Sequence, residues 1–211
     1  MKCTLRRIML LFALLPVLAG CLPASEGNSV LFQDDFSDSA SGWSTLRKDN
    51  QVMDYEEGTF RFVVDKPQFD YWSTPRLSFT DTHIEVDAIK VAGGEDNDFG
   101  IICRYQDQDN FYGFLISSDG YYGISQRKNK EHRIISPEGK LLYSDAIHQG
   151  AASNRIAADC NGNRLALSVN GKRLVEVENS DFTAGDVGLI AGTLDALAVE
   201  IRFDNFRVTR P

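Results

Sequence analysis

Two Asn-Gly pairs, Asn161-Gly162 and Asn170-Gly171, stand nine residues apart and constrain the fold of this 211-residue chain more than any other feature. Asn-Gly supplies the positive φ angles of a type I′ turn and is the strongest short-range signal for a β-hairpin. Between the two pairs, the sequence RLALSV (164–169) alternates large apolar residues with small or polar ones, which is the period of a half-buried strand. Residues 154–177 therefore predict a three-stranded antiparallel meander.

Short apolar runs separated by turn residues continue along most of the chain. The expected strands are 59–65, 83–91, 100–106, 111–117, 121–126, 154–160, 164–169, 173–177, 186–192 and 198–208. No long window shows a helical period, and the segment 127–153, which is rich in turn residues, is not assigned. Regular short strands with turns between them predict an all-β fold, a two-sheet antiparallel β-sandwich with very little helix.

The N-terminus has the pattern of a targeting segment. A basic start, an apolar run at 8–18 and two small residues precede Cys21, as in a secretory signal peptide, and the run is too short for a spanning helix. The ending LAGC resembles the bacterial lipobox, which implies that Cys21 is acylated and becomes the mature N-terminus. We expect a lipoprotein signal peptide at 1–20, a lipidated tether at 21–29 and a sandwich domain at 30–211.

The expected lipid anchor and the net negative charge restrict which molecules this protein can bind. A lipid on Cys21 holds a soluble domain at a membrane surface, and Leu22 in place of Asp implies the outer membrane if the cell has one, otherwise the cell surface. Residues 1–20 contain three of the 22 basic residues and none of the 30 acidic ones, so the mature chain carries a net charge of −11. Such a chain repels phosphate backbones, and nucleic acid is excluded as a partner.

Two cysteines remain once Cys3 leaves with the signal and Cys21 takes the lipid. In an oxidising envelope compartment, Cys103 and Cys160 are expected to form a disulfide. The alternative is two separate buried thiols. The distance between the two Cα atoms decides whether they can pair, and the sequence does not give that distance.

The densest aromatic stretch is FGIICRYQDQDNFYGFLISSDGYYGIS, residues 99–125. A turn at 107–110 places Cys103 opposite Phe114 and Tyr105 opposite Tyr112 on one apolar face. A three-residue turn at 118–120 keeps the apolar residues of the next strand on the same face, because a shift of one residue would exchange the faces. Most of these rings are therefore expected in the core.

Acidic residues offer two candidate sites. Glu85 and Asp87 share a strand face and could act as the carboxyl pair of a glycosidase, although alternating acids more often mark a solvated face. A second group gathers the hard oxygen donors that calcium prefers; it comprises Asp96, Asp98, Asp107 and Asp109. Because Asp and Asn are common turn residues, we expect no cofactor and keep a structural Ca²⁺ as the alternative.

Aromatic residues near charged groups indicate a sugar site. The segment DKPQFDYWSTPRL (65–77) combines Tyr71 and Trp72 with nearby acidic and basic residues. Sugar rings stack their C–H faces on aromatic rings while their hydroxyls bond to polar neighbours. The alternative is a Trp that closes one end of the sandwich, since Trp is mostly buried. The candidate ligand residues are Tyr71, Trp72, Arg104 and Tyr121.

Over about residues 32–208 the chain resembles the concanavalin A-like lectin/glucanase jelly-roll superfamily, near the laminin-G-like and 3-keto-disaccharide hydrolase-type domains of bacterial surface proteins. The resemblance rests on DDFSDSASGW, DFGIICRYQDQDNFYGFLISSDGYYGI, NRIAADCNGNRLALSVNG, DFTAGDVGLIAGT and VEIRFDNFRV. It implies a jelly roll and a carbohydrate-type ligand on the concave sheet and its rim loops.

The glucanase branch of that superfamily carries an E-x-D-x-x-E strand motif. The sequence EVDAIK matches it at Glu85 and Asp87 but has Lys90 in place of the second glutamate, so the acid/base that the motif implies is missing. We expect a lipid-anchored, lectin-like protein that binds carbohydrate or an envelope component without catalysis. Two alternatives stay open: a glycoside hydrolase using Glu85 and Asp87, and a structural or partner-binding lipoprotein.

Overall fold

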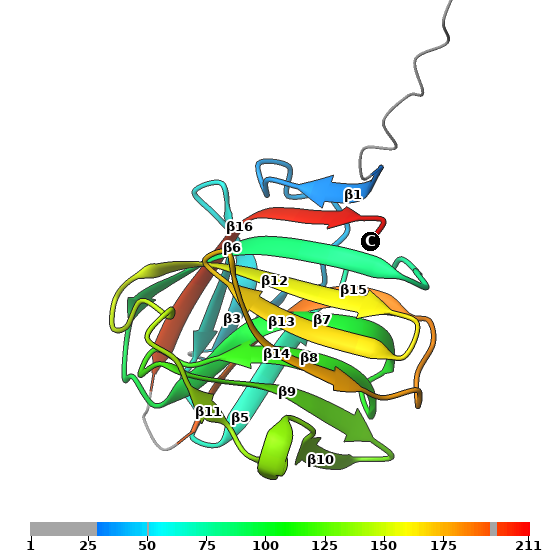
Figure 1. The fold of residues 1–211 in the computed structure, drawn as a ribbon. Coiled ribbons are helices and arrows are strands. Elements are labelled where there is room, and N and C mark those ends of the chain that lie inside the picture. The colour runs from blue at the N-terminus through cyan, green and yellow to red at the C-terminus, as the bar shows by residue number, and fades with distance from the viewer. Residues whose placement is uncertain (1–28, 50, 195–197) are drawn as a thin grey trace, which may run out of the picture.

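The computed structural model of the protein describes residues 29–49, 51–194 and 198–211. They form two antiparallel sheets packed face to face (Figure 1), which confirms the predicted all-β sandwich. The helix in these ranges is one short 3₁₀ turn, Pro137–Gly139, and none of the described helices is long and apolar enough to cross a membrane. The expected signal peptide, Cys21 and most of the tether lie outside the described residues.

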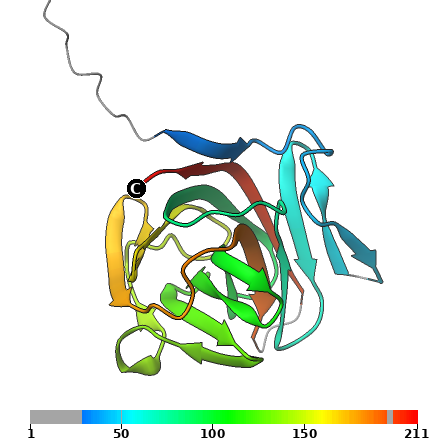
Figure 2. The ribbon, with the colours of Figure 1, turned by 90° about the vertical axis from the view of Figure 1, so that its right-hand side faces the viewer.

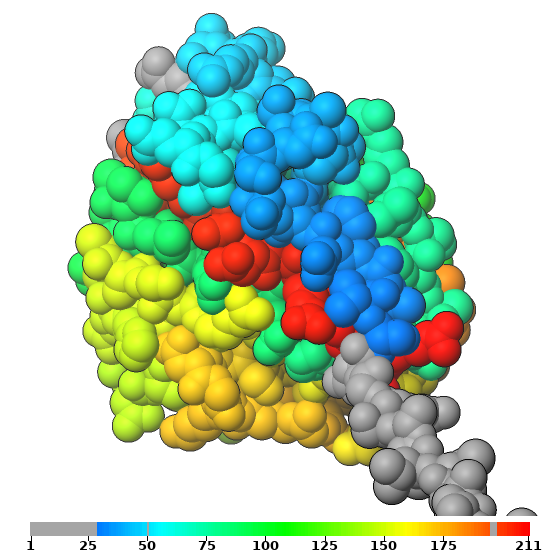
Figure 3. Space-filling view, turned by 90° about the horizontal axis from the view of Figure 1, so that it is seen from above, coloured from blue at the N-terminus to red at the C-terminus, as the bar shows by residue number. Residues whose placement is uncertain are grey.

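The larger sheet has nine described strands in the order β14-β13-β12-β6-β16-β4-β3-β2, with β1 paired to β16. Its strands are β1 (Val30–Asp34), β2 (Leu46–Lys48), β3 (Gln51–Glu56), β4 (Thr59–Val64), β6 (Thr82–Ala92), β12 (Ser153–Asn161), β13 (Arg164–Val169), β14 (Lys172–Glu178) and β16 (Val199–Thr209). Figure 2 shows its two ends, β12–β14 and β2–β4, on opposite sides of β16. Figure 3 shows β1, in blue, lying along β16, in red, so the first and last described strands are neighbours.

The smaller sheet has seven strands within the same ranges, in the order β10-β9-β8-β7-β15-β5, with β11 paired to β9. Its strands are β5 (Phe69–Ser73), β7 (Asn97–Asp107), β8 (Asn110–Ile116), β9 (Tyr121–Lys128), β10 (Glu131–Ile134), β11 (Leu142–Tyr143) and β15 (Asp186–Thr193).

The main core fills the space between the two sheets. On β6, Ile84, Val86 and Ala88 are fully buried, whereas the residues between them stay partly exposed, because successive side chains of a strand point to opposite faces. Trp43 packs against the last strand, with its ring centroid 5.0 Å from that of Phe206.

All ten predicted strands are present, with ends that differ by at most three residues. Six further strands are not predicted by the sequence: β1, β2, β3, β5, β10 and β11. Each of these has six residues or fewer, and so short a run shows little periodicity. Two of them, β10 and β11, lie within residues 127–153, for which the sequence predicts no element.

The second Asn-Gly turn forms as predicted and the first is displaced by one residue. Asn170 and Gly171 have φ angles of 50° and 82° and connect β13 to β14. In the first turn, Asn161 pairs with Arg164, so Gly162 and residue 163 make the turn. In this register the main-chain N–H of Gly162 donates a hydrogen bond to the Asp81 carboxylate at 2.8 Å, which is a tertiary contact.

The pairing of β7 with β8 differs from the prediction by two residues. Cys103 lies opposite Tyr112 rather than Phe114, because Arg104 has a φ of 53° and the ladder is interrupted beyond Cys103. A shift of two residues keeps the same face buried, so the predicted core rings are buried. The prediction that Tyr105 shares this face is wrong. Beyond the bulge, Tyr105 packs against Phe111 in a second apolar cluster outside the main core.

The two sheets are joined by the predicted disulfide. Cys103 on β7 is bonded to Cys160 on β12, with 6.9 Å between their Cα atoms. Both residues are fully buried in the main core. The bond therefore fixes the smaller sheet to the larger one at a point that water does not reach.

Replacing both Cys103 and Cys160 by alanine should lower the free energy of unfolding by about 4 kcal/mol, because the disulfide restricts the unfolded chain over a long loop. The bonded residues are 57 positions apart in the sequence. Guanidinium unfolding of the wild type and of the double variant, each with and without reductant, measures the effect. The reduced wild type and the variant should share a midpoint. Equal midpoints for the oxidised wild type and the variant would contradict the prediction.

Candidate functional site

The outer face of the smaller sheet carries its own apolar cluster. Ile102, Phe111, Leu115 and Ile190 are buried there, although this face points away from the main core. Side chains of neighbouring strands cover them, among them Trp72 of β5. A sheet face that is buried in this way indicates a surface built for packing or for binding rather than for solvation.

Trp72 is the aromatic centre of this face. Its ring centroid lies 5.4 Å from that of Phe111 on β8, and the Arg127 guanidinium of β9 lies 5.4 Å from the Trp72 ring. That distance is within the range of a cation–π interaction. Trp72 remains partly exposed, so a ligand can reach one part of the ring.

Two carboxyl groups meet beside Trp72. Gly192 of β15 pairs with Asp70 of β5 on one side and with Asp98 of β7 on the other. A Cβ atom at position 192 would collide with a carboxylate oxygen of each. Glycine at this position therefore allows Asp70 and Asp98 to form a hydrogen bond across β15. We call Asp70, Trp72, Asp98, Phe111 and Arg127 together the Trp72 surface.

The pKa values of the two carboxyl groups are raised to different extents. Burial, together with the neighbouring Asp70, raises the pKa of Asp98 well above its ordinary value. Burial also raises the pKa of Asp70, but the charges of His132 and Arg127 oppose that change. His132 itself has a pKa lowered by burial. Asp98 is therefore the carboxyl group that holds a proton to higher pH, and Asp70 is the one whose ionised form His132 and Arg127 favour.

One buried polar atom of the Trp72 surface, Nε of Arg127, has no hydrogen-bond partner among the described residues. Buried polar groups in proteins are nearly always hydrogen-bonded, and an exception calls for a physical explanation. The Asp98 carboxyl group, by contrast, has Asp70 as its partner across Gly192. The Arg127 N–H is a donor, and a hydroxyl group of a ligand would match it.

The structure separates the four residues predicted to bind a ligand. Trp72 lies on the Trp72 surface. Tyr71 is adjacent in β5 but points to the opposite face and packs against the main core, where burial raises its pKa. Tyr121 is 43% exposed, on β9 near the other edge of the sheet.

Arg104 has a structural position. Its side chain is 1% exposed and pairs with Asp81 at 3.1 Å. It also donates to the main-chain carbonyl oxygens of Gly162 and Phe182, at 2.8 Å each. The side chain thus fastens the bulge of β7 to two loops, and the structure does not bring it to the Trp72 surface.

Glu85 and Asp87 lie on the outer face of the larger sheet, away from Trp72. Both are held by one guanidinium, that of Arg155, at 3.2 Å and 3.0 Å respectively. Asp87 also accepts a hydrogen bond from Asn205 at 2.9 Å. The pair expected for the hydrolase alternative is therefore part of an ion-pair network on a polar sheet face.

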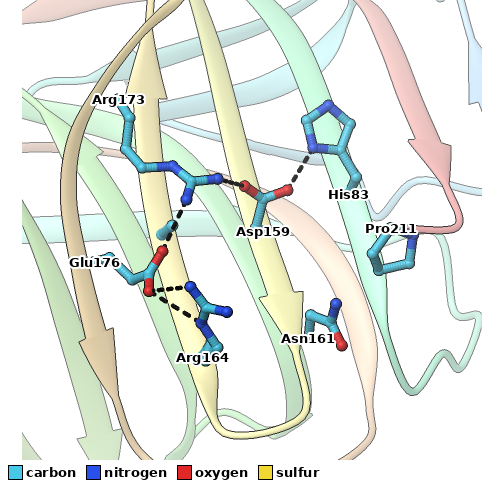
Figure 4. A pocket seen from close by; sticks show the side chains of 8 residues that line it. His83, Asp159, Asn161, Arg164, Arg173, Glu176 and Pro211 are labelled. Atoms are coloured by element: carbon cyan, nitrogen blue, oxygen red, sulfur yellow. Dashed lines mark hydrogen bonds and ion pairs between the residues drawn. The ribbon is translucent and has the colours of Figure 1, made fainter.

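A pocket on that same face is shown in Figure 4. Its volume is about 370 Å³. Asp159 accepts from His83 at 2.6 Å and from Arg173 at 3.0 Å, which raises the pKa of His83 and lowers that of Asp159. Glu176 pairs with Arg164 and Arg173 in turn. The charged groups that Figure 4 draws are compensated by one another, so we place the candidate site on the Trp72 surface instead.

The four acids of the calcium alternative are not brought together. Asp98 lies near the start of β7 and Asp107 at its end, a separation of about 30 Å along a strand of this length. Asp96 precedes the strand and Asp109 lies in the turn after it. No group of three or more His, Cys, Asp or Glu side chains in the described ranges could hold a metal ion.

The sequence matches no protein-family model, and no curated protein matches it. Solved structures do resemble it. The carbohydrate-binding module CBM66 from Bacillus subtilis aligns with a TM-score of 0.63 at 17% identity, over 80% of this chain and 95% of the module. A protein of unknown function with a galectin-like fold from Bacillus subtilis aligns with a TM-score of 0.63 at 8% identity, over 87% and 97%.

An enzyme shares the fold as well. The Bacillus licheniformis β-glucanase aligns with a TM-score of 0.59 at 12% identity, over 88% of this chain and 100% of the enzyme. Identities this low establish the fold alone. The chain thus has the concanavalin A-like jelly-roll fold that its sequence resembles, and this fold occurs in a sugar-binding module and in a hydrolase.

Asp98→Asn should stabilise the protein at pH 7 by about 1–2 kcal/mol, and by less as the pH falls toward 4. The folded-state pKa of Asp98 is raised above the unfolded value of 3.8. The stability that comes from holding the proton is therefore complete below the unfolded pKa and is lost as the pH rises through the folded pKa. Asparagine stays neutral and avoids this loss. Thermal unfolding of both proteins between pH 4 and pH 8 measures the difference.

Asp109→Asn is the matched control, because Asp109 is exposed in the turn after β7. It should leave the wild-type pH profile unchanged. If Asp98→Asn were instead more destabilising at pH 7 than at pH 4, Asp98 would be ionised in the folded protein, and the proton assignment would be wrong.

Proposed function

We propose that this protein is a cell-envelope lipoprotein whose jelly roll binds carbohydrate at the Trp72 surface. The observation that carries the proposal is a partly exposed Trp72 ring on the same face as Arg127, whose buried Nε has no hydrogen-bond partner among the described residues. A sugar offers an apolar C–H face for the ring and hydroxyl groups for the polar groups beside it. Sites of this kind combine aromatic walls with a few placed polar groups.

Binding is favoured over hydrolysis by the spacing of the carboxyl groups. Glycosidases place their two carboxyl groups at least about 5 Å apart, so that the scissile bond fits between them. Asp70 and Asp98 are joined by a hydrogen bond, which leaves no room for a glycosidic bond. Glu85 and Asp87 are both occupied by Arg155. The likeness to CBM66, a carbohydrate-binding module, supports the same choice.

Trp72→Ala should abolish glycan binding or weaken it at least tenfold, because the stacking face is lost. The measurement is a screen of the full chain on an array of plant, bacterial and mucin glycans, with calcium and with chelator, followed by titration of each glycan bound. An effect of chelator would favour the calcium alternative over the metal-free site proposed.

Glu85→Gln is the matched control on the other sheet, and it should leave both binding and folding unchanged. Loss of turnover in this variant, with binding retained, would establish the hydrolase alternative instead. If the folded wild type binds no glycan, or if Trp72→Ala binds as the wild type does, sugar binding at the Trp72 surface is wrong.

The membrane anchor is the second part of the proposal. The lipobox-like LAGC places Cys21 nine residues before the start of β1 at Val30. A tether of that length allows the sandwich to stand close to the membrane surface.

Cys21→Ser should move the protein from the membrane fraction to the soluble fraction and abolish incorporation of a labelled fatty acid, because the acylated thiol is lost. Cys3→Ser is the control, since Cys3 lies within the expected signal peptide, and it should behave as the wild type. Membrane retention and labelling of Cys21→Ser would show that Cys21 is not the anchor.

A further inference from the structure

Two tyrosines form an exposed aromatic pair away from the Trp72 surface. The chain contains 13 Phe, 7 Tyr and 2 Trp residues, and within the described ranges only Tyr121 and Tyr143 have strongly exposed rings, at 43% and 57%. The two rings contact each other edge to face, with their centroids 5.7 Å apart. Exposed apolar side chains that occur singly are ordinary, but a contacting pair of exposed rings marks a candidate interaction surface.

The pair is held by its surroundings. Tyr121 and Tyr143 lie directly opposite each other where β9 pairs with β11, and Gln149 donates a hydrogen bond to the Tyr143 hydroxyl at 2.8 Å. Gly120 has a φ of +95°, and a Cβ atom there would come within 2.7 Å of the Tyr143 ring. Because both rings are fixed before any ligand arrives, binding costs little side-chain entropy. We call Tyr121, Tyr143 and Gln149 the Tyr143 platform.

A polar pocket adjoins the platform. Its volume is about 400 Å³, and its lining includes Tyr143, Ser144, Asp145 and Lys172. These side chains supply a hydroxyl group and an exposed ion pair beside an aromatic ring, since Nζ of Lys172 lies 3.4 Å from Oδ1 of Asp145. A cavity of this size suits a small ligand, and its mixture of donors and acceptors suits a ligand rich in hydroxyl groups.

The platform is separate from the Trp72 surface. β5, which carries Trp72, is one edge of the smaller sheet, and β11 pairs with β9 toward the other edge. Trp72 on β5 and Tyr143 on β11 have β15, β7, β8 and β9 between them, which is about 24 Å at the spacing of neighbouring strands. One sugar unit therefore cannot contact both rings.

We infer that the Tyr143 platform is a second carbohydrate site, which binds one sugar unit against the Tyr143 ring independently of the Trp72 surface. That the ligand is a carbohydrate rests on the proposed function, whereas the location of the site rests on the tyrosine pair and the adjoining pocket. A protein partner is a poorer fit, because a stable interface covers about 800 Å² on each partner. The other strongly exposed large apolar residues, Val30, Leu31, Leu77 and Val91, lie on other elements and do not extend the platform.

The test compares four proteins on the glycan array and by titration of every glycan bound: the wild-type full chain, Trp72→Ala, Tyr143→Ala and the double variant. Trp72→Ala should keep a set of weaker hits, and Tyr143→Ala should weaken those hits about tenfold, as expected for a lost stacking contact. The double variant should bind none. Tyr143→Phe keeps the ring and loses only the bond to Gln149, so it should bind within about threefold of the wild type.

Each other result overturns the inference. If Tyr143→Ala changes no glycan while Trp72→Ala abolishes all of them, the Trp72 surface is the only sugar site and the proposed function stands. If the folded wild type binds no glycan, both proposals fail. If Tyr143→Ala binds glycans as the wild type does but loses a co-purifying envelope protein, the platform is a protein-docking surface.

Discussion

The central strands of the smaller sheet are buried on both faces, and the position of the proposed site depends on this. Strands β7, β8, β9 and β15 show nearly continuous burial rather than the alternation seen on β6. The inner face packs in the main core, and the outer face must be covered by something other than the second sheet. Trp72 and Arg127 provide part of that cover, together with the smaller apolar cluster. The surface that can bind a ligand is thus made of side chains that shield a sheet.

The two outer faces of the sandwich differ in how their charges are compensated. On the larger sheet, acids and bases alternate across neighbouring strands, as in the contacts of Arg155 with Glu85 and Asp87. Exposed ion pairs of this kind contribute little to stability, but they occupy the carboxylates of Glu85 and Asp87. On the smaller sheet, Asp98 is buried with a raised pKa beside Asp70, and Nε of Arg127 is buried without a hydrogen-bond partner among the described residues. A buried polar atom without a partner is costly, and in the proposed function a ligand hydroxyl group takes that place.

Much of the fold could be predicted from the sequence, because alternation and turn residues are local signals. All ten predicted strands and the Cys103–Cys160 disulfide are present. Most of the site could not be predicted in the same way. Trp72 was identified, but Tyr71 points to the opposite face, and the contact of Asp70 with Asp98 depends on the register of β15 between them. Arg104 was a predicted ligand residue, but its bulge and its contacts with buried carbonyl groups are tertiary features that the local sequence does not indicate.

The most direct test of sugar binding at the Trp72 surface is the indole region of a ¹⁵N–¹H spectrum recorded while a bound glycan is added. The chain has two tryptophans, so the wild-type protein gives two indole N–H signals, and Trp72→Ala, which keeps only that of Trp43, assigns them. Trp43 is 4% exposed and donates its indole N–H to Asp34 at 2.8 Å, which makes it an internal reference. The account predicts that the Trp72 signal shifts in a saturable way and that the Trp43 signal stays in place. A glycan that binds the protein without moving the Trp72 signal would contradict it.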